Sequence, residues 1–210
     1  MISLCGATRG RPSYFKEAIE SALNTAAFPD RLEILVRVDN DDPSQYSGIP
    51  KQVQFYSGPR LGMGAAKPIA LMAQRARGNL IAQFSDDQEY VTPGWDVFLE
   101  EAYEDRPLVL KVNEGREKLE NPIVTNQWME KVGYLYPMEF HHMYSDTFVE
   151  TVATKAGILK SVPYVHIKHK KFIAGRDKVS EEARLMATED FQTFVAMKEK
   201  MDELARKLAL

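Results

Sequence analysis

Four short apolar runs in the first half of the chain each end in a cluster of polar residues. The runs cover residues 2–5, 33–38, 53–56 and 80–84. Their length and the abrupt polar breaks after them favour buried strands. The polar residues that follow are therefore expected in loops at the ends of strands.

Helical spacing separates these runs. Ser13 is the expected cap of a first helix, whose apolar residues lie three and four positions apart. A second helix is predicted over residues 65–77, where Gly78 would stop it. Strands that alternate with helices predict an α/β fold with a mostly parallel sheet flanked by helices. Such sheets bind ligands beyond the carboxyl ends of their strands, where the polar clusters lie.

The second half of the chain is less regular. We expect strands over residues 108–112 and 162–168, and helices over residues 126–132 and 146–156. One long helix is predicted from residue 181 to the end. Its apolar stripe packs either on the domain or on a second copy of the chain, so a homodimer through this helix is one alternative. The helix also carries Phe191; the stripe, at spacings of three and four, consists of Phe194, Met197, Met201, Leu204 and Leu208.

Length and composition fit one domain with a small appendage. The chain has 210 residues, of which 44% are apolar, enough to bury a core. A net charge of −3 excludes the broad basic surface of a general nucleic-acid-binding protein. The single cysteine, Cys5, is interpreted as a small buried hydrophobe in a reducing compartment. Neither a signal peptide nor a membrane segment stands out, so the sequence predicts a cytoplasmic protein.

Two adjacent carboxylates, Asp86 and Asp87, follow the fourth apolar run directly. They repel each other, and holding them together is costly unless a cation or a helix end compensates. A divalent ion such as Mg²⁺ or Mn²⁺ accepts carboxylate oxygens and neutralises the charge of a departing diphosphate. For the pair taken alone, the alternative is a solvated turn in which an aspartate caps a helix.

Charged residues also follow the other runs. Asp39 ends the second run, and Thr8 and Arg9 follow the first, so all three are expected at the same sheet edge as the carboxylate pair. A carboxylate there accepts a hydrogen bond from a nucleobase, and arginine pairs with phosphate oxygens. Further candidates for anion binding are Arg11, Arg60 and Lys67. The last of these lies in the first turn of the second helix, where a phosphate would meet the helix N-terminus.

The order of these motifs resembles the opening of family 2 glycosyltransferases. Residues 8–12 read Thr-Arg-Gly-Arg-Pro, and residues 18–22 read Ala-Ile-Glu-Ser-Ala. The family's usual start is similar: an apolar strand, Thr-Arg-Asn-Arg-Pro, and then Glu-Ala-Ile-x-Ser. The stretch from Arg60 through residues 85–87 to Trp95 resembles the donor-site region of the family, with its Asp-x-Asp-type signature.

This resemblance spans roughly residues 2–101 and continues loosely to about residue 177. It implies a GT-A fold, which is Rossmann-like, over residues 1–177, with a C-terminal helical extension over residues 178–210. Residues 1–112 would form the donor half and residues 113–177 the acceptor half. The implied activity is that of an inverting hexosyltransferase that uses Mn²⁺ or Mg²⁺. Its donor would be a nucleotide-diphosphate sugar, with a UDP-sugar favoured, and its acceptor is unknown.

The resemblance also assigns individual residues. Thr8 and Arg9 would line the nucleotide pocket, and Asp39 would meet the base. Lys67 would lie near the diphosphate and Asp86 near the ribose, and Asp87 would bind the metal. Two departures from the family pattern matter. Gln88 replaces an acid in the signature, which leaves Asp87 as the sole carboxylate ligand there, and Gly10 replaces the usual asparagine.

An inverting transferase needs a carboxylate that takes the proton of the acceptor hydroxyl. The family places this base before a helix in the second half, usually as Glu-Asp. The nearest match is Asp146, without the preceding glutamate, and it is our predicted base; its alternative role is a helix cap. The literal pair Glu189-Asp190 lies later in the chain and ranks second.

The family also often supplies a histidine from its last strand to the metal. His166 lies in the last predicted strand and His169 directly follows it. We favour His169 because the family's histidine comes late in such a strand. A solvated histidine is the alternative. Among the aromatic residues, Trp95 is expected to pack beneath the donor site rather than stack on a sugar. The candidates for lining an acceptor pocket are Tyr134, Tyr136 and Phe140.

Three other functions remain open at this point. A sugar nucleotidyltransferase would need a Gly-x-Gly-x-Arg loop, and residues 6–11 have the wrong spacing. A phosphohydrolase of the aspartyl-phosphate type would need Asp-x-Asp after the first strand, and residues 6–12 contain no acid. A catalytically degenerate GT-A domain that binds a nucleotide sugar or a partner is supported by Gln88 and by the missing glutamate before Asp146.

Overall fold

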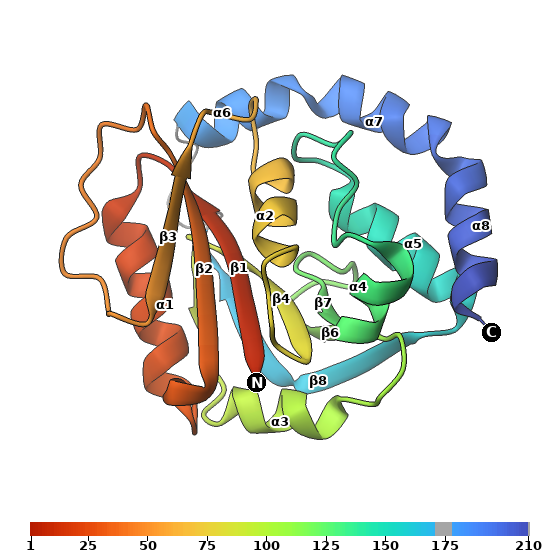
Figure 1. The fold of residues 1–210 in the computed structure, drawn as a ribbon, viewed down its shortest axis with the longest axis horizontal. Coiled ribbons are helices and arrows are strands. Elements are labelled where there is room, and N and C mark those ends of the chain that lie inside the picture. Colours follow the sequence, from red (N-terminus) through yellow and green to blue (C-terminus); the bar gives the residue numbers. More distant parts are fainter. Residues whose placement is uncertain (171–177, 210) are drawn as a thin grey trace.

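The computed structural model describes residues 1–170 and 178–209. A single curved sheet with the strand order β3-β2-β1-β4-β7-β6-β8-β5 forms its centre (Figure 1). The strands are β1 (Ile2–Thr8), β2 (Leu32–Asp39), β3 (Val53–Gly58), β4 (Leu80–Ser85), β5 (Gln88–Tyr90), β6 (Val109–Asn113), β7 (Ile123–Thr125) and β8 (Leu159–His169). The helices are α1 (Pro12–Thr25), η1 (a 3-10 turn, Pro29–Arg31), α2 (Ala66–Ala73), α3 (Trp95–Ala102), α4 (Asn126–Val132), α5 (Ser145–Ala156), α6 (Lys178–Leu185), α7 (Ala187–Ala196) and α8 (Lys198–Leu208).

The predicted parallel sheet is present in the first half of the chain. Strand β1 lies between β2 and β4 and is parallel to both, and β3 extends this set as a parallel neighbour of β2. The second half adds antiparallel pairings through β5 and β7, which the sequence analysis did not predict. Each of these two strands has only three residues, too few for a periodic pattern to be recognised.

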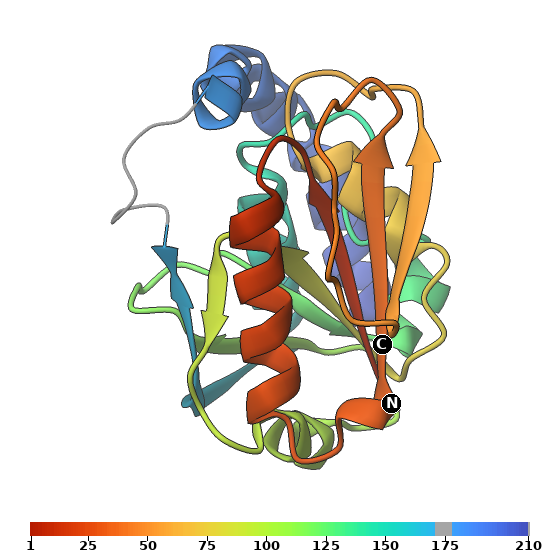
Figure 2. The same cartoon turned by 90° about the vertical axis from the view of Figure 1, so that its left-hand side faces the viewer.

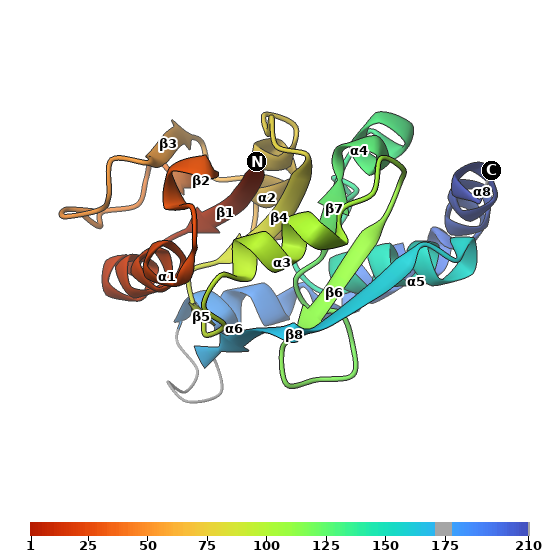
Figure 3. The ribbon, with the colours of Figure 1, turned by 90° about the horizontal axis from the view of Figure 1, so that it is seen from below.

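Helices cover both faces of the sheet. Figure 3 shows α1 and α3 on one face and α2 and α4 on the other, and Figure 2 shows α1 lying along the sheet. The buried face of α1 consists of the four apolar residues predicted from their spacing: Phe15, Ala18, Ile19 and Ala22. The doubly covered sheet therefore explains why its strands read as continuous apolar runs.

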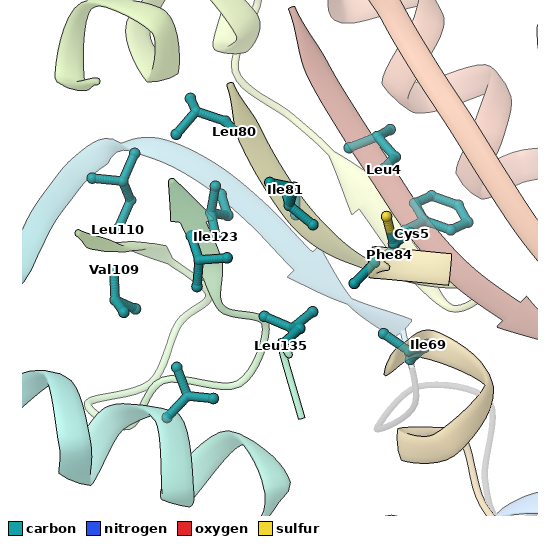
Figure 4. Packing of buried hydrophobic residues seen from close by; sticks show 14 of the residues in the cluster. Leu4, Cys5, Ile69, Leu80, Ile81, Phe84, Val109, Leu110, Ile123 and Leu135 are labelled. Atoms are coloured by element: carbon teal, nitrogen blue, oxygen red, sulfur yellow. The ribbon is translucent and has the colours of Figure 1, made fainter. Parts of the chain in front are cut away.

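The core is continuous between the two halves of the chain. Figure 4 shows Cys5 of β1 beside Phe84 of β4, with Ile69 of α2 and Ile123 of β7 nearby. All four side chains are buried. Cys5 is the small buried residue that its apolar context predicted, and burial raises the pKa of its thiol.

Two predicted helix boundaries were wrong. Ser13 does not cap α1, because the helix begins at Pro12, whose fixed φ suits the first helical position, and no side chain caps it. Helix α2 ends at Ala73, before Gly78. Gly78 instead permits a close approach to β1, since a Cβ atom there would lie 2.7 Å from the Oγ atom of Ser3.

The single C-terminal helix predicted from residue 181 is three helices, α6, α7 and α8. Figure 1 shows them as an arch that passes along one side of the molecule. Neither proline nor glycine marks the breaks at Met186 and Met197, so packing on the domain decides where the chain bends. The domain boundary predicted at residue 177 lies outside the described residues.

The apolar stripe of this segment packs on its own domain. Met197, Met201 and Leu208 are buried, and Phe194 and Leu204 are partly buried against the same core. Helix α8 lies against α5, where Lys155 forms an ion pair with Asp202. The first of the two alternatives for the stripe is therefore confirmed. Across the described residues, no helix combines the length and apolar character that a membrane crossing requires.

We predict that Met201→Ala lowers the free energy of unfolding by about 2–5 kcal/mol, because it leaves a cavity between α8 and the domain. Val195→Ala, at an exposed position of α7, should change it by less than about 0.5 kcal/mol. Urea unfolding at two protein concentrations measures both effects. A midpoint that rises with concentration would contradict the packing of the stripe within one chain.

Candidate active site

The register of the central strands aligns their carboxyl ends. Thr8 lies opposite Val38 on β2, and Ala7 lies opposite Ser85 on β4. Asp39 ends β2, and Asp86 directly follows β4. The residues predicted to share one sheet edge are therefore brought together there.

Asp86 is the buried centre of this edge, with only 7% of its surface exposed. Its two oxygens accept hydrogen bonds of 2.9 Å from the Thr8 hydroxyl and 3.0 Å from the Arg11 guanidinium. Arg11 immediately precedes α1, which directs its side chain back to the strand ends. Burial raises the pKa of Asp86 to about 6, although the positive charge of Arg11 acts in the opposite direction.

Arg9 is bound by the acidic loop after β2. Its guanidinium lies 3.2 Å from Asp39 and makes two bonds, of 2.6 and 3.1 Å, with the carboxylate of Asp41. The backbone amide of Gly10 donates to Asp42, which also accepts a 2.7 Å bond from the Tyr46 hydroxyl. Sequence reasoning missed the positions 42 and 46, whose contacts hold this loop against the end of β1.

Asp87 lies beside His169, at the other side of the carboxylate pair. The Oδ1 atom of Asp87 is 3.5 Å from the Nδ1 atom of His169. The contact arises because β5 pairs with β8 so that Gln88 lies opposite His169, and the amide of Lys170 donates to the carbonyl of Asp87. Both side chains are largely buried, with 17% and 8% exposed for Asp87 and His169.

The two candidate histidines occupy different places. Successive side chains of a strand alternate between its faces, so His166 and His169, three positions apart, point to opposite faces. The backbone of His166 pairs with Val91 and Thr92, farther along the chain from the carboxylate pair. Only His169 is brought to Asp87.

Polar residues from β4 and from the loop after β6 surround the far side of His169. The Nδ2 atom of Asn121 lies 3.0 Å from the Nε2 atom of His169, and its amide oxygen accepts a 2.7 Å bond from Gln83. Asn121 also donates to Glu114, whose pKa is raised by burial. Glu114, Glu120 and His169 present potential ligand atoms within 4.8 Å of one another. No motif indicated Glu114, Glu120 or Asn121, because the fold alone brings them to His169.

Asp146, the predicted base, lies in the first turn of α5. It does not cap the helix, because the N-cap is Tyr144; its carboxylate accepts from the amide of Thr147 instead. Burial raises the pKa of Tyr136, and the charges of Asp146 and Glu114 raise it further. The Tyr136 hydroxyl donates to Gln83 of β4, which also donates to Asn121.

The second candidate for the base, Asp190, has a different role. Its side chain is fully buried and accepts hydrogen bonds from three consecutive backbone amides, those of residues 141–143. These bonds engage both carboxylate oxygens inside the protein. Its neighbour Glu189 is exposed and lies 3.4 Å from the imidazole of His141.

The predicted role holds for one of the aromatic residues and fails for two others. Trp95 is fully buried and donates its indole N–H to the carbonyl of Ala22, which confirms its packing role. Tyr136 and Phe140 are buried in the core, so the prediction that they line an acceptor pocket was wrong. Tyr134 is partly buried against the same core.

Two predicted anion-binding cations lie after β3, Arg60 in the loop before α2 and Lys67 in α2 itself. Arg60 forms an ion pair with Glu182 of α6, the helix that lies above the carboxyl ends of β1, β2 and β3 in Figures 1 and 2. Lys67 lies in the first turn of α2 and is partly buried. The N-terminus of α2 was predicted to meet a phosphate, but the amide of Ala66 in its first turn donates to the carbonyl of His141.

Solved structures share this architecture. A mannosyltransferase of Pyrobaculum calidifontis, PcManGT, in complex with GDP-Man and Mn²⁺, matches 99% of this chain and 68% of its own, with a TM-score of 0.66 and 12% identity. Residues 1–349 of S. aureus TarS match 99% of this chain and 70% of their own, with a TM-score of 0.62 and 15% identity. The TarS complex with UDP-GlcNAc matches with a TM-score of 0.60. The chain has the GT-A fold.

The GT-A fold was predicted from the strand and motif order, and the C-terminal helical extension is also present. Comparison of the sequence alone does not find these relatives. No model of a known protein family matches it, and no curated protein matches it by sequence. The longer TarS chain, of which this chain covers 36%, shows that the same domain also occurs as part of a larger protein.

The raised pKa of Asp86 predicts a specific pH dependence. Because the folded state holds this proton more tightly than the unfolded state, the associated stability is complete below about pH 4. It is lost as the pH rises through about 6, by about 3 kcal/mol in all. Urea unfolding between pH 4 and 7 should therefore show that wild type loses stability relative to Asp86→Asn. Parallel curves for the two proteins would contradict the raised pKa.

Proposed function

We propose that this chain is a metal-dependent glycosyltransferase of the hexosyltransferase type, which moves a sugar from a nucleoside diphosphate to an acceptor hydroxyl with inversion. The observation that carries the proposal is the contact between Asp87 and His169 beside the buried Asp86. PcManGT and TarS, the GT-A structures similar to this chain, are described as bound to GDP-Man with Mn²⁺ and to UDP-GlcNAc. Their ligands support the donor class.

The residues at the carboxylate pair fit a divalent ion. The Nδ1 atom of His169 is buried and has no hydrogen-bond partner among the described residues, and it faces a carboxylate oxygen at 3.5 Å. Asp87 and His169 would therefore hold a divalent ion between them. The PcManGT complex contains Mn²⁺, which supports that ion as the candidate. When bound, the ion would neutralise charge on the departing diphosphate.

The strand ends account for the nucleotide. Asp39 would accept from the base, and Asp86, fixed by Thr8 and Arg11, would accept from a ribose hydroxyl. Arg9 contributes indirectly, because the bonds to Asp39 and Asp41 hold the loop that shapes this pocket. Lys67 and, on release from Glu182, Arg60 would supply positive charge near the diphosphate.

Asp146 would act as the general base. The acceptor oxygen attacks the anomeric carbon while the bond from that carbon to the diphosphate oxygen breaks, and the hydroxyl proton passes to the carboxylate of Asp146. The nucleoside diphosphate leaves with the bonding electrons. Asp146 is suited to this because it lies at a helix start, near the polar region that joins Tyr136 to His169.

A thermal-shift panel tests the donor and metal assignments together. UDP and GDP, each with and without Mn²⁺, should raise the unfolding temperature only when the metal is present and the nucleotide is correct. Asp87→Ala and His169→Ala should abolish the Mn²⁺-dependent shift, because they remove the two ligands. His166→Ala is the matched control and should keep it. Loss of the shift in His166→Ala alone would contradict the metal assignment.

Release of nucleoside diphosphate from UDP-GlcNAc or GDP-mannose tests the base. Asp146→Asn should bind the donor as wild type does, while the turnover rate falls by about 10²–10⁴-fold, because the proton acceptor is lost. Transfer of sugar to water measures this rate without an identified acceptor. A wild-type protein that binds donor but releases no diphosphate would favour a catalytically degenerate domain, and rapid turnover by Asp146→Asn would rule out this base.

A further inference from the structure

A buried carboxylate of the C-terminal arch holds the segment before the proposed base. Asp190 of α7 is fully buried, and its oxygens accept from the amides of His141, His142 and Met143 at 2.8, 2.9 and 2.7 Å. Charged acceptors form stronger hydrogen bonds than neutral ones, and three consecutive amides fix the course of the backbone. Asp190 therefore determines where this segment lies.

The segment connects two parts of the proposed site. On one side, the carbonyl of His141 accepts from the amide of Ala66 at the start of α2. Gly64 lies so close that a Cβ atom there would be 2.3 Å from the same carbonyl oxygen. On the other side, α5 begins at Ser145, whose hydroxyl donates to the carbonyl of His142 at 3.0 Å. Asp146 follows one residue later.

The turn between the anchored amides and the helix leaves little freedom. Tyr144 has a φ of 64°, a left-handed conformation that a residue with a side chain adopts only when its surroundings impose it. The centroid of the Tyr144 ring lies 5.6 Å from that of Phe191 and 5.7 Å from that of Phe194, both on α7. Helix α7 thus contacts this part of the chain in two ways, through the hydrogen bonds of Asp190 and through the packing of its aromatic rings on Tyr144.

We propose that Asp190 is a positioning residue that sets the place of Asp146 relative to the donor. The inference rests on the proposed function of Asp146. Asp190 touches no reacting atom; it acts through the backbone of residues 141–143 and the start of α5. The C-terminal arch, on this view, completes the acceptor half of the site instead of serving as an appendage.

Asp190→Asn separates this role from simple packing. The amide keeps the size of the side chain, but its NH₂ group faces backbone donors and cannot accept from them. The aromatic contacts of Tyr144 remain, so helix α7 should stay in place. The matched control is Asp202→Asn on α8, which removes an exposed carboxylate that also links the arch to α5, through Lys155.

Three measurements on the full chain decide the matter. Hydrogen exchange of at least one of the amides of residues 141–143 should accelerate by about tenfold or more in Asp190→Asn, because an NH₂ group replaces one of the two acceptor oxygens. The Kd of UDP or GDP with Mn²⁺ should change by less than about twofold, since the strand ends bind the nucleotide. The kcat for diphosphate release from UDP-GlcNAc or GDP-mannose should fall by about 10–100-fold. Asp202→Asn should resemble wild type in all three.

Each contrary result has a distinct meaning. Unchanged exchange would show that Asp190 does not hold the segment, and faster exchange with wild-type kcat would show that the segment does not position the base; either overturns the inference. Equal losses in nucleotide affinity and kcat, with faster exchange throughout the chain, would reduce Asp190 to a general folding role. Wild-type protein that neither binds nor cleaves a donor would instead overturn the proposed function, and the positioning role with it.

Discussion

Two adjacent carboxylates leave the end of a buried strand, and the charge they carry must be compensated within the fold. Asp86 is compensated inside the protein, by the hydroxyl of Thr8 and the guanidinium of Arg11. Asp87 turns the other way, to His169 on β8. Both residues lie in the turn between β4 and β5, where Asp86 meets the end of β1 and Asp87 meets the end of β8. In the proposed function, the first carboxylate would organise the nucleotide side and the second would meet a cation.

The site depends on strands from both halves of the chain. Strand β1, between β2 and β4, aligns the ends that carry Thr8, Asp39 and Asp86. The antiparallel pairing of β5 with β8 then brings His169, more than eighty residues away in the sequence, to Asp87. Helix α6 reaches back to Arg60, and α7 to the segment before α5. The described part of the C-terminal arch therefore contacts both the loop before α2 and the segment before α5, which are the donor and acceptor sides in the proposed function.

The similarity to PcManGT and TarS at 12–15% identity shows how little sequence the GT-A fold requires. A doubly covered sheet needs apolar residues at its buried positions, and many combinations of such residues satisfy that need. The motifs at strand ends are more restricted, because their chemistry depends on particular side chains. This explains why ordered motifs suggested the family while no family model matches the chain.

The sequence by itself determined the local elements and the strand-end chemistry. Apolar runs located the central strands, the three- and four-residue spacing gave the buried face of α1, and Asp86-Asp87 identified the acidic edge. It did not determine contacts between distant segments. The short strands β5 and β7, the bends at Met186 and Met197, the partners of His169 and the burial of Asp190 follow from the tertiary structure alone. The spacing of apolar residues indicates whether a residue faces the core. These features depend instead on contacts between segments that come together only when long loops close.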